Sequence, residues 1–80
     1  ALFAYQTSQE NIKLKKEALE VNSLSVEYAE ELLDYGYATY LEVLTAQQNA
    51  LNAGLDLAVE KNKELQALVS LYQALGGGAE

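Results

Sequence analysis

The feature that most limits how this chain can fold is a single helix break inside a sequence of helix formers. Proline is absent and glycine occurs only at 36, 54 and 76–78, whereas Ala, Leu, Glu, Lys and Gln, all strong helix formers, dominate. Gly36 suits the position after a helix end, where a left-handed backbone is needed. Thr39 and Glu42 then have the spacing of a capping box, which begins a helix. A stop and a start this close together predict an αα-hairpin.

The predicted fold is all-α, a long antiparallel hairpin with helices at about 8–35 and 39–75, a turn at 36–38 and a Gly-rich end at 76–80. A second capping-box pattern, Thr7-Ser8-Gln9-Glu10, favours a start near residue 8. The apolar stretch 1–5 could equally extend the first helix upstream. At about 1.5 Å per residue the helices would be roughly 40–55 Å long, a length typical of coiled coils, bundles and extended barrels.

Both predicted helices carry two series of apolar residues that recur every seven positions. The first helix has Tyr5, Ile12, Leu19, Val26 and Leu33, and also Leu14, Val21, Tyr28 and Tyr35. The second has Leu44, Leu51, Ala58, Leu65 and Tyr72, and also Ala46, Ala53, Ala67 and Ala74, a series that Glu60 interrupts. Two series offset by two positions lie about 200° apart around a helix, so each helix is expected to have a neighbour on both sides.

The seven-residue period favours left-handed coiled-coil packing. Neighbours on both sides are typical of a wall of helices: a solenoid, a sheet of coiled coil or a closed α-barrel. A hairpin buried in a dimeric four-helix bundle is the simpler alternative. A chain of eighty residues buries little apolar surface on its own. It has no cysteine and so no disulfide to compensate. We therefore expect self-association or membership in a larger chain.

Composition argues against several classes of function. The net charge is −7, from twelve acidic residues and five lysines, whereas a nucleic-acid site needs clustered cations. Without His or Cys the chain lacks the commonest metal ligands and the commonest general base, and no calcium-loop spacing is present. We therefore predict neither an enzyme nor a cofactor. No secretory signal is visible at residues 1–20, which in a complete protein would favour the cytoplasm; the missing initiator Met favours a fragment.

Acidic residues and lysines are expected in different parts of the hairpin. Acidic residues gather around the turn, at Glu27, Glu30, Glu31, Asp34 and Glu42. The lysines are expected in a mixed charged belt farther from it, near Glu60 and Glu64: Lys13, Lys15, Lys16, Lys61 and Lys63. Gly54 is expected to let the helices approach closely.

Two stretches resemble the TolC-like outer-membrane factors. Tyr35-Gly36-x-x-x-Tyr40-Leu41-Glu42-Val43-Leu44-x-Ala46-Gln47-x-x-x-Leu51 resembles a signature of that family. Leu71-Tyr72-Gln73-Ala74-Leu75-Gly76-Gly77-Gly78 resembles its C-terminus. The resemblance implies the closing segment of a trimeric efflux channel, whose β-barrel in the outer membrane continues as an α-barrel across the periplasm. It also implies docking onto a periplasmic adaptor and an inner-membrane pump.

The same resemblance implies site residues. Tyr35, Gly36, Tyr37 and Ala38 would form the periplasmic tip that docks the adaptor. Glu42 would face the lumen near a constricted mouth, where three copies form a ring that favours cations. Thr45, one turn further, takes a position at which some relatives carry a second acid. Local chemistry alone accounts for Gly36 as a helix stop and for Glu42 as part of the capping box.

We therefore predict a segment of an outer-membrane efflux channel, periplasmic in location and driven by its partners. As an isolated fragment it is expected to self-associate. The alternatives are the coiled-coil hairpin of a periplasmic adaptor and a cytoplasmic helical interaction module. An upstream signal peptide, amphipathic β-strands and a repeat of this hairpin would distinguish a channel from both.

Overall fold

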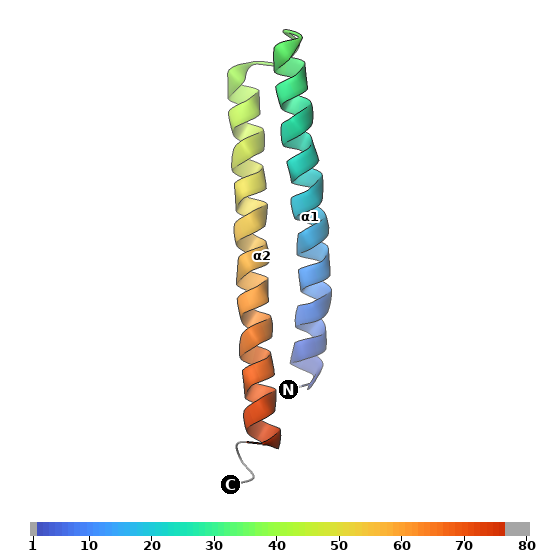
Figure 1. Cartoon of the computed structure of the whole chain (residues 1–80), viewed down its shortest axis with the longest axis vertical. Helices are drawn as coiled ribbons and strands as arrows, with labels where there is room; N and C mark the ends of the chain where they lie inside the picture. Colours follow the sequence, from blue (N-terminus) through green and yellow to red (C-terminus); the bar gives the residue numbers. More distant parts are fainter. Residues whose placement is uncertain (1, 77–80) are drawn as a thin grey trace.

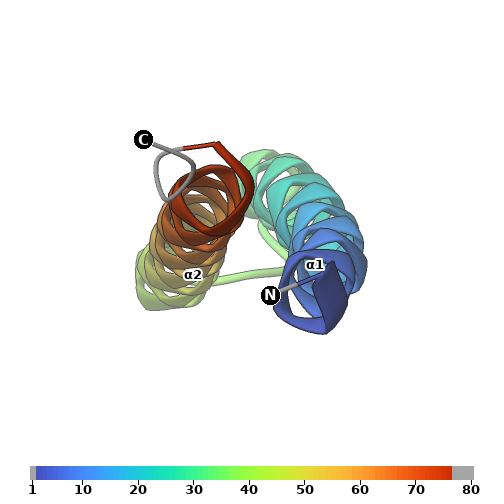
Figure 2. The ribbon, with the colours of Figure 1, turned by 90° about the horizontal axis from the view of Figure 1, so that it is seen from below.

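The structure, a computed structural model that describes residues 2–76, is a hairpin of two long helices. Helix α1 spans Leu2–Asp34 and helix α2 spans Tyr40–Leu75. The helices lie side by side, with the connection at one end of a molecule that measures 66 × 15 × 11 Å (Figure 1). Seen along its long axis, the hairpin has its two helices winding about each other (Figure 2). The predicted all-α hairpin is confirmed.

The helix ends differ slightly from the prediction. Helix α1 begins at Leu2 rather than near residue 8, so the upstream extension, and not the Thr7 box, describes its start. Thr7 lies inside the helix and does not cap it. Ser8 is also inside the helix and is buried. Helix α1 ends one residue before the predicted end and α2 begins one residue after the predicted start. Gly77 and Gly78 lie outside the described residues.

One face of each helix packs against the other helix, and its residues alternate three and four positions apart. We term the buried and half-buried residues on these two faces the inner seam. In α1 they are Tyr5, Ser8, Ile12, Lys15, Leu19, Asn22, Val26, Ala29 and Leu33. In α2 they are Val43, Ala46, Ala50, Ala53, Leu57, Glu60, Glu64, Ala67 and Leu71. This spacing is the heptad pattern of a coiled coil.

Alanine occupies four of the nine inner-seam positions of α2. Val43 is the most buried apolar side chain, at 3% exposure. A Cβ atom added at Gly54 would lie 3.9 Å from Leu19 Cδ1, which places the α2 backbone near that leucine. That distance is an ordinary van der Waals contact, so the close approach expected at Gly54 does not require a glycine at this position.

One of the two apolar series of each helix faces away from the other helix. In α1, Leu14, Val21 and Tyr28 are 60–63% exposed. In α2, Leu51 and Leu65 are 57–59% exposed, whereas Ala53 of the alternative series is buried. Of the two apolar series predicted for α2, the leucine-rich one thus faces outward and the alanine series faces inward. The hairpin covers one apolar face of each helix and leaves the other uncovered.

Neither α1 nor α2 contains a stretch long and apolar enough to cross a membrane, as far as the described residues extend.

Candidate functional site

The turn between the helices is built from local hydrogen bonds. Gly36 has a φ of +79°, in the left-handed region. Its N–H donates to Leu33 O at 3.0 Å, and the N–H of Tyr37 donates to Leu32 O at 2.8 Å. These two bonds form the Schellman motif, which satisfies carbonyl groups left free at a helix C-terminus. The helix stop predicted at Gly36 is confirmed, and the motif holds the turn in a defined conformation.

A capping box begins α2 directly after the turn. Thr39 Oγ1 accepts from the Glu42 N–H at 3.3 Å, and the Thr39 N–H donates to Glu42 Oε2 at 2.7 Å. Both hydrogen bonds predicted from the sequence are present. The Glu42 carboxylate therefore has a fixed position at the N-terminus of α2, and its side chain is exposed.

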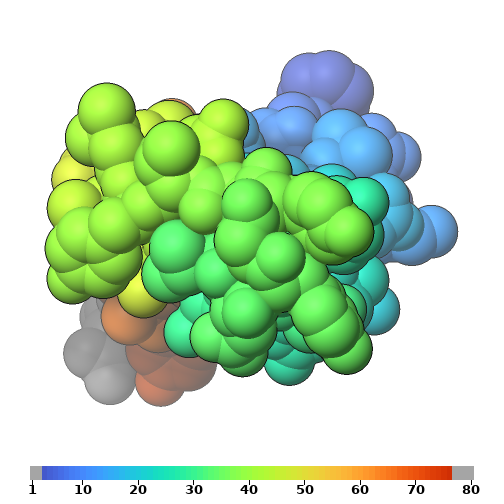
Figure 3. Space-filling view, turned by 90° about the horizontal axis from the view of Figure 1, so that it is seen from above, coloured from blue at the N-terminus to red at the C-terminus, as the bar shows by residue number. Residues whose placement is uncertain are grey.

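Large apolar and aromatic side chains are exposed at the turn end of the hairpin. Tyr35, Tyr37, Tyr40 and Leu41 are 65–80% exposed, and we term them the tip surface. The space-filling view from this end shows that the turn and the adjoining helix ends form the whole tip (Figure 3). Ala38 is half-buried. Of the residues expected to dock a partner, the two tyrosines are therefore available and Ala38 is less so.

Tyr40 and Leu41 belong to this surface but were not among the predicted tip residues. Both lie in the first turn of α2, and both are at least 65% exposed. A signal was present in the sequence, because they follow Thr39, the residue that caps this turn. Residues in the first turn of a helix lie close to the loop that precedes it, so the tip surface extends past the loop itself.

Acidic side chains surround the tip on the α1 side. Glu27, Glu30, Glu31 and Asp34 line a shallow groove together with Leu24 and Tyr28. No lysine occurs between residues 17 and 60, so no cation of this chain's own sequence is close to the groove. The tip surface thus adjoins a strongly negative region.

Thr45 lies one helical turn beyond Glu42 and is also exposed. Its Oγ1 donates to Leu41 O at 3.0 Å. Residues three apart are neighbours on a helix surface, so α2 presents a carboxylate and a neutral hydroxyl together. Glu42 and Thr45 thus lie on one surface of α2, and the pore role that the resemblance implies for them stays a prediction.

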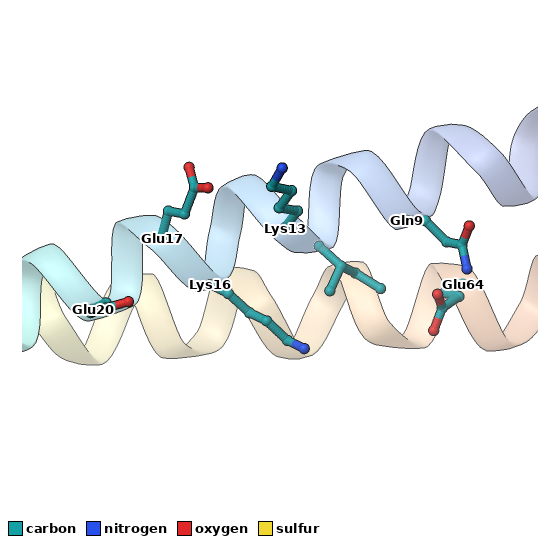
Figure 4. A pocket seen from close by; sticks show the side chains of 7 residues that line it. Gln9, Lys13, Lys16, Glu17, Glu20 and Glu64 are labelled. Carbon is teal, nitrogen blue, oxygen red and sulfur yellow. The ribbon is translucent and has the colours of Figure 1, made fainter.

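The lysines lie farther from the turn. A second shallow groove lies there, lined by Gln9, Ile12, Lys13, Lys16, Glu17, Glu20 and Glu64. Gln9 and Glu64 point toward each other there across the two helices, whereas Lys13 and Glu17 point away from α2 (Figure 4). Over the described residues one ion pair forms, between Lys63 Nζ and Glu60 Oε1 at 3.7 Å, and it lies within α2.

Glu60 is the one acidic residue of the described chain that is buried. It is 9% exposed, and its Oε2 atom has no hydrogen-bond partner. It lies in the inner seam, where it takes the place of an alanine in the predicted series of seven-residue steps. The mixed belt of charge is therefore partly internal, with Glu60 and the half-buried Lys15 in the seam itself.

No group of three or more potential metal ligands is found among residues 2–76. A family model described as outer membrane efflux protein matches residues 1–77. No curated protein and no solved structure matches the chain.

Proposed function

Because the chain belongs to the outer membrane efflux protein family, we propose that it forms part of the wall of an export channel. In this proposal α1 and α2 are neighbouring helices in the wall of an α-barrel. The observation that carries the proposal is that each helix has an exposed apolar heptad series in addition to the buried one. A hairpin that folds alone needs one apolar face per helix. A helix in a barrel wall needs two, because it has a neighbour on each side.

The barrel would be a homotrimer, with this segment in the periplasm and the energy for export supplied by a pump. No cofactor is required for such a passive channel. The gene on either side of these eighty residues distinguishes this role from that of an adaptor hairpin. A channel gene encodes a signal peptide, amphipathic β-strands and a second copy of the hairpin; their absence would contradict the proposal.

The tip is proposed to dock the periplasmic adaptor. Tyr35, Gly36, Tyr37 and Ala38 supply the turn, and Tyr40 and Leu41 enlarge its apolar surface. Two features support this role. The turn is rigidly hydrogen-bonded, and aromatic side chains on a rigid base lose little conformational freedom on binding and are enriched at interfaces.

A substitution at Tyr37 tests docking in a channel that contains this segment. Tyr37 is 80% exposed, so Tyr37→Asp leaves packing within the hairpin intact while placing a charge on the docking surface. Export should be lost, drug susceptibility should rise, and trimers should still assemble. Tyr37→Phe is the matched control, since it keeps the ring. Unchanged susceptibility in the Tyr37→Asp strain would count against docking at the tip.

Glu42 is proposed to act in the gate as well as in the cap, with Thr45 beside it as a neutral lumen residue. Three copies of Glu42 around a threefold axis would form a carboxylate ring, which favours cations. The capping box accepts Gln in place of Glu. Glu42→Gln therefore removes the charge and keeps the cap, Thr39→Ala weakens the cap and keeps the charge, and Glu42→Ala removes both.

Planar-bilayer recordings of these three variants separate the two roles. If the charge gates the channel, Glu42→Gln and Glu42→Ala should both raise the leak conductance of the closed state and reduce cation preference. Thr39→Ala should then resemble the parent. Parent-like conductance in Glu42→Gln would reduce Glu42 to a helix cap.

A further inference from the structure

Helix α2 has a polar strip between its inner seam and its exposed apolar series. The strip takes every third or fourth residue from Glu42 to Gln73, and all ten of these residues are exposed. Six of them carry amide or hydroxyl groups: Thr45, Asn49, Asn52, Gln66, Ser70 and Gln73. Glu42, Asp56 and Lys63 are charged, and Val59 is the one apolar member. We term these ten residues the polar strip of α2.

Helix α1 has a strip with the same spacing but a different chemistry. It runs from residue 13 to residue 34, and its seven members are exposed. Ser23 is uncharged, and the other six are charged: Lys13, Lys16, Glu20, Glu27, Glu30 and Asp34. We term these seven residues the charged strip of α1. Three of them line the groove of Figure 4 and three line the groove near the turn, so both grooves lie along this strip.

The two strips lie on opposite sides of the hairpin. Both inner seams alternate steps of three and four residues, and Ile12 and Val43 each begin a step of three. Lys13 follows Ile12, whereas Glu42 precedes Val43, so the two strips lie on different flanks of their seams, because one residue turns a helix by about 100°. A two-fold axis perpendicular to the plane of an antiparallel pair relates equivalent positions, which therefore share one side. Different flanks thus lie on opposite sides.

The position of Glu42 decides which strip faces the lumen of the proposed channel. In the wall, each helix contacts its neighbours through the inner seam and the exposed apolar series, so the two strips are the surfaces left in contact with water. Glu42 and Thr45 begin the polar strip and are the residues proposed to face the lumen. The rest of the strip continues their line along α2. It therefore belongs to the lumen side, and the charged strip belongs to the periplasmic side.

Asp56 is the next carboxylate along the polar strip after Glu42. It lies fourteen residues further along the chain, which is about 21 Å of helix at about 1.5 Å per residue. Its neighbours three and four positions away, at 52, 53, 59 and 60, include no cation. Lys63, the one cation of the strip, lies 3.7 Å from Glu60 Oε1 instead. The charge of Asp56 is therefore available to ions beside the strip.

We propose that the polar strip of α2 lines the lumen of the channel and that Asp56 forms a second carboxylate ring beyond the gate. This inference rests on the channel role proposed above. Three copies of Asp56 around the threefold axis favour cations, as carboxylate rings do, at a site separate from Glu42. Between the two rings the strip offers the hydroxyl and amide groups of Thr45, Asn49 and Asn52. Water-soluble cations are therefore the solutes that this lumen suits best.

Cysteine substitution tests which strip faces the lumen. This segment has no native cysteine, and Ser70→Cys in the polar strip has a matched control in Ser23→Cys in the charged strip, since both serines are exposed. Each is placed in a channel that contains this segment and no other cysteine. In planar bilayers a positively charged methanethiosulfonate reagent should lower the conductance of Ser70→Cys channels in up to three steps, one for each copy. Ser23→Cys channels should keep the parent conductance. Asn52→Cys, nearer the turn, should respond as Ser70→Cys does.

Asp56 is tested by removing its charge alone. Asp56→Asn should shift the reversal potential in a KCl gradient toward zero, because the second ring loses its preference for cations. Glu20→Gln removes an exposed carboxylate from the charged strip and should leave the reversal potential at the parent value. Asp56→Asn should also leave the closed-state leak unchanged, which separates this ring from the gate at Glu42. An unchanged reversal potential in Asp56→Asn, or equal shifts in both variants, would overturn the second ring.

The outcomes separate this inference from the channel role on which it rests. A parent protein without conductance would contradict the channel role itself. A conducting parent in which Ser23→Cys responds to the reagent and Ser70→Cys does not would overturn only the assignment of the strips. A response in both variants, or in neither, would overturn that assignment as well.

Discussion

At the scale of single residues, Gly36 fixes the reversal of the chain through its backbone alone. A Cβ added there would meet no atom within 4 Å, while φ is +79°. Gly36→Ala should therefore lower the free energy of unfolding by about 1–2 kcal/mol, the cost of the left-handed conformation. Gly36→Asn should lose less, because asparagine tolerates this region. Urea denaturation checks both; an unchanged midpoint for Gly36→Ala would contradict this account of the turn.

Gly54 presents the opposite case, a glycine whose position does not require one. It lies within α2, and an added Cβ would make an ordinary 3.9 Å contact with Leu19 Cδ1. Gly54→Ala should stabilise the hairpin by about 1 kcal/mol through helix propensity. Thermal unfolding followed by circular dichroism measures the change. Ala53→Gly, at the neighbouring buried position, is the control and should destabilise. A lower midpoint for Gly54→Ala would show that the helices cannot accept the added methyl group.

At the scale of the helices, Glu60 is the residue that least fits its surroundings. It occupies an inner-seam position of α2 where Ala46, Ala53 and Ala67 precede and follow it at seven-residue steps. Its Oε2 atom is buried without a hydrogen-bond partner, and leaving such a group unsatisfied costs about 1–3 kcal/mol. Glu60→Ala should therefore raise the free energy of unfolding by about 1 kcal/mol, the lower end of that range.

The control for Glu60 is its ion-pair partner. Lys63 Nζ lies 3.7 Å from Glu60 Oε1, and the Lys63 side chain is 62% exposed. Pairs with an exposed member contribute about 0–1 kcal/mol, so Lys63→Ala should change stability little. A large loss of stability in both variants would show that the pair stabilises the seam and would refute the prediction for Glu60.

The helices and their heptad spacing could be predicted from the sequence, but not which apolar face would pack inside the hairpin. Helix propensity and capping are local properties, so the break at Gly36 and the box at Thr39 are readable from neighbouring residues. In α2 the Leu44 series is bulkier than the Ala46 series, yet the alanines face α1. That choice depends on how closely two backbones can approach, a property of the pair and not of either helix. Val43 and Leu57 were missed for the same reason.

At the scale of the whole molecule, the candidate site was predictable only in its local parts. The Schellman turn and the position of the Glu42 carboxylate follow from residues within six positions of Gly36. A docking surface and a gate are relations between this chain and other chains. Spacing along one sequence carries no information on where a threefold axis or an adaptor would lie. The structure adds that an apolar face of each helix is exposed, which agrees with the proposed channel wall.

Polarity along the inner seam predicts a gradient of stability through the hairpin. On the turn side of Leu19 and Ala53 the seam is apolar except for Asn22, whereas toward the open end it includes Ser8, Lys15, Glu60 and Glu64. Fewer apolar contacts and free helix ends favour local opening. Amide hydrogen exchange, measured at concentrations where the chain is monomeric, should therefore be slower around Val26 and Ala46 than around Ser8 and Ala67.

The gradient should respond to substitutions in the polar half of the seam. Replacing Lys15 by Leu together with Glu60→Ala gives that half the apolar character of the turn half, since both positions belong to the inner seam. Exchange near Ser8 and Ala67 should then slow toward the rates near the turn, while rates around Val26 change little. Uniform protection along the parent hairpin would mean that the helices separate as one unit. In that case seam polarity would not set the order of opening, and the closed turn would be no more stable than the open end.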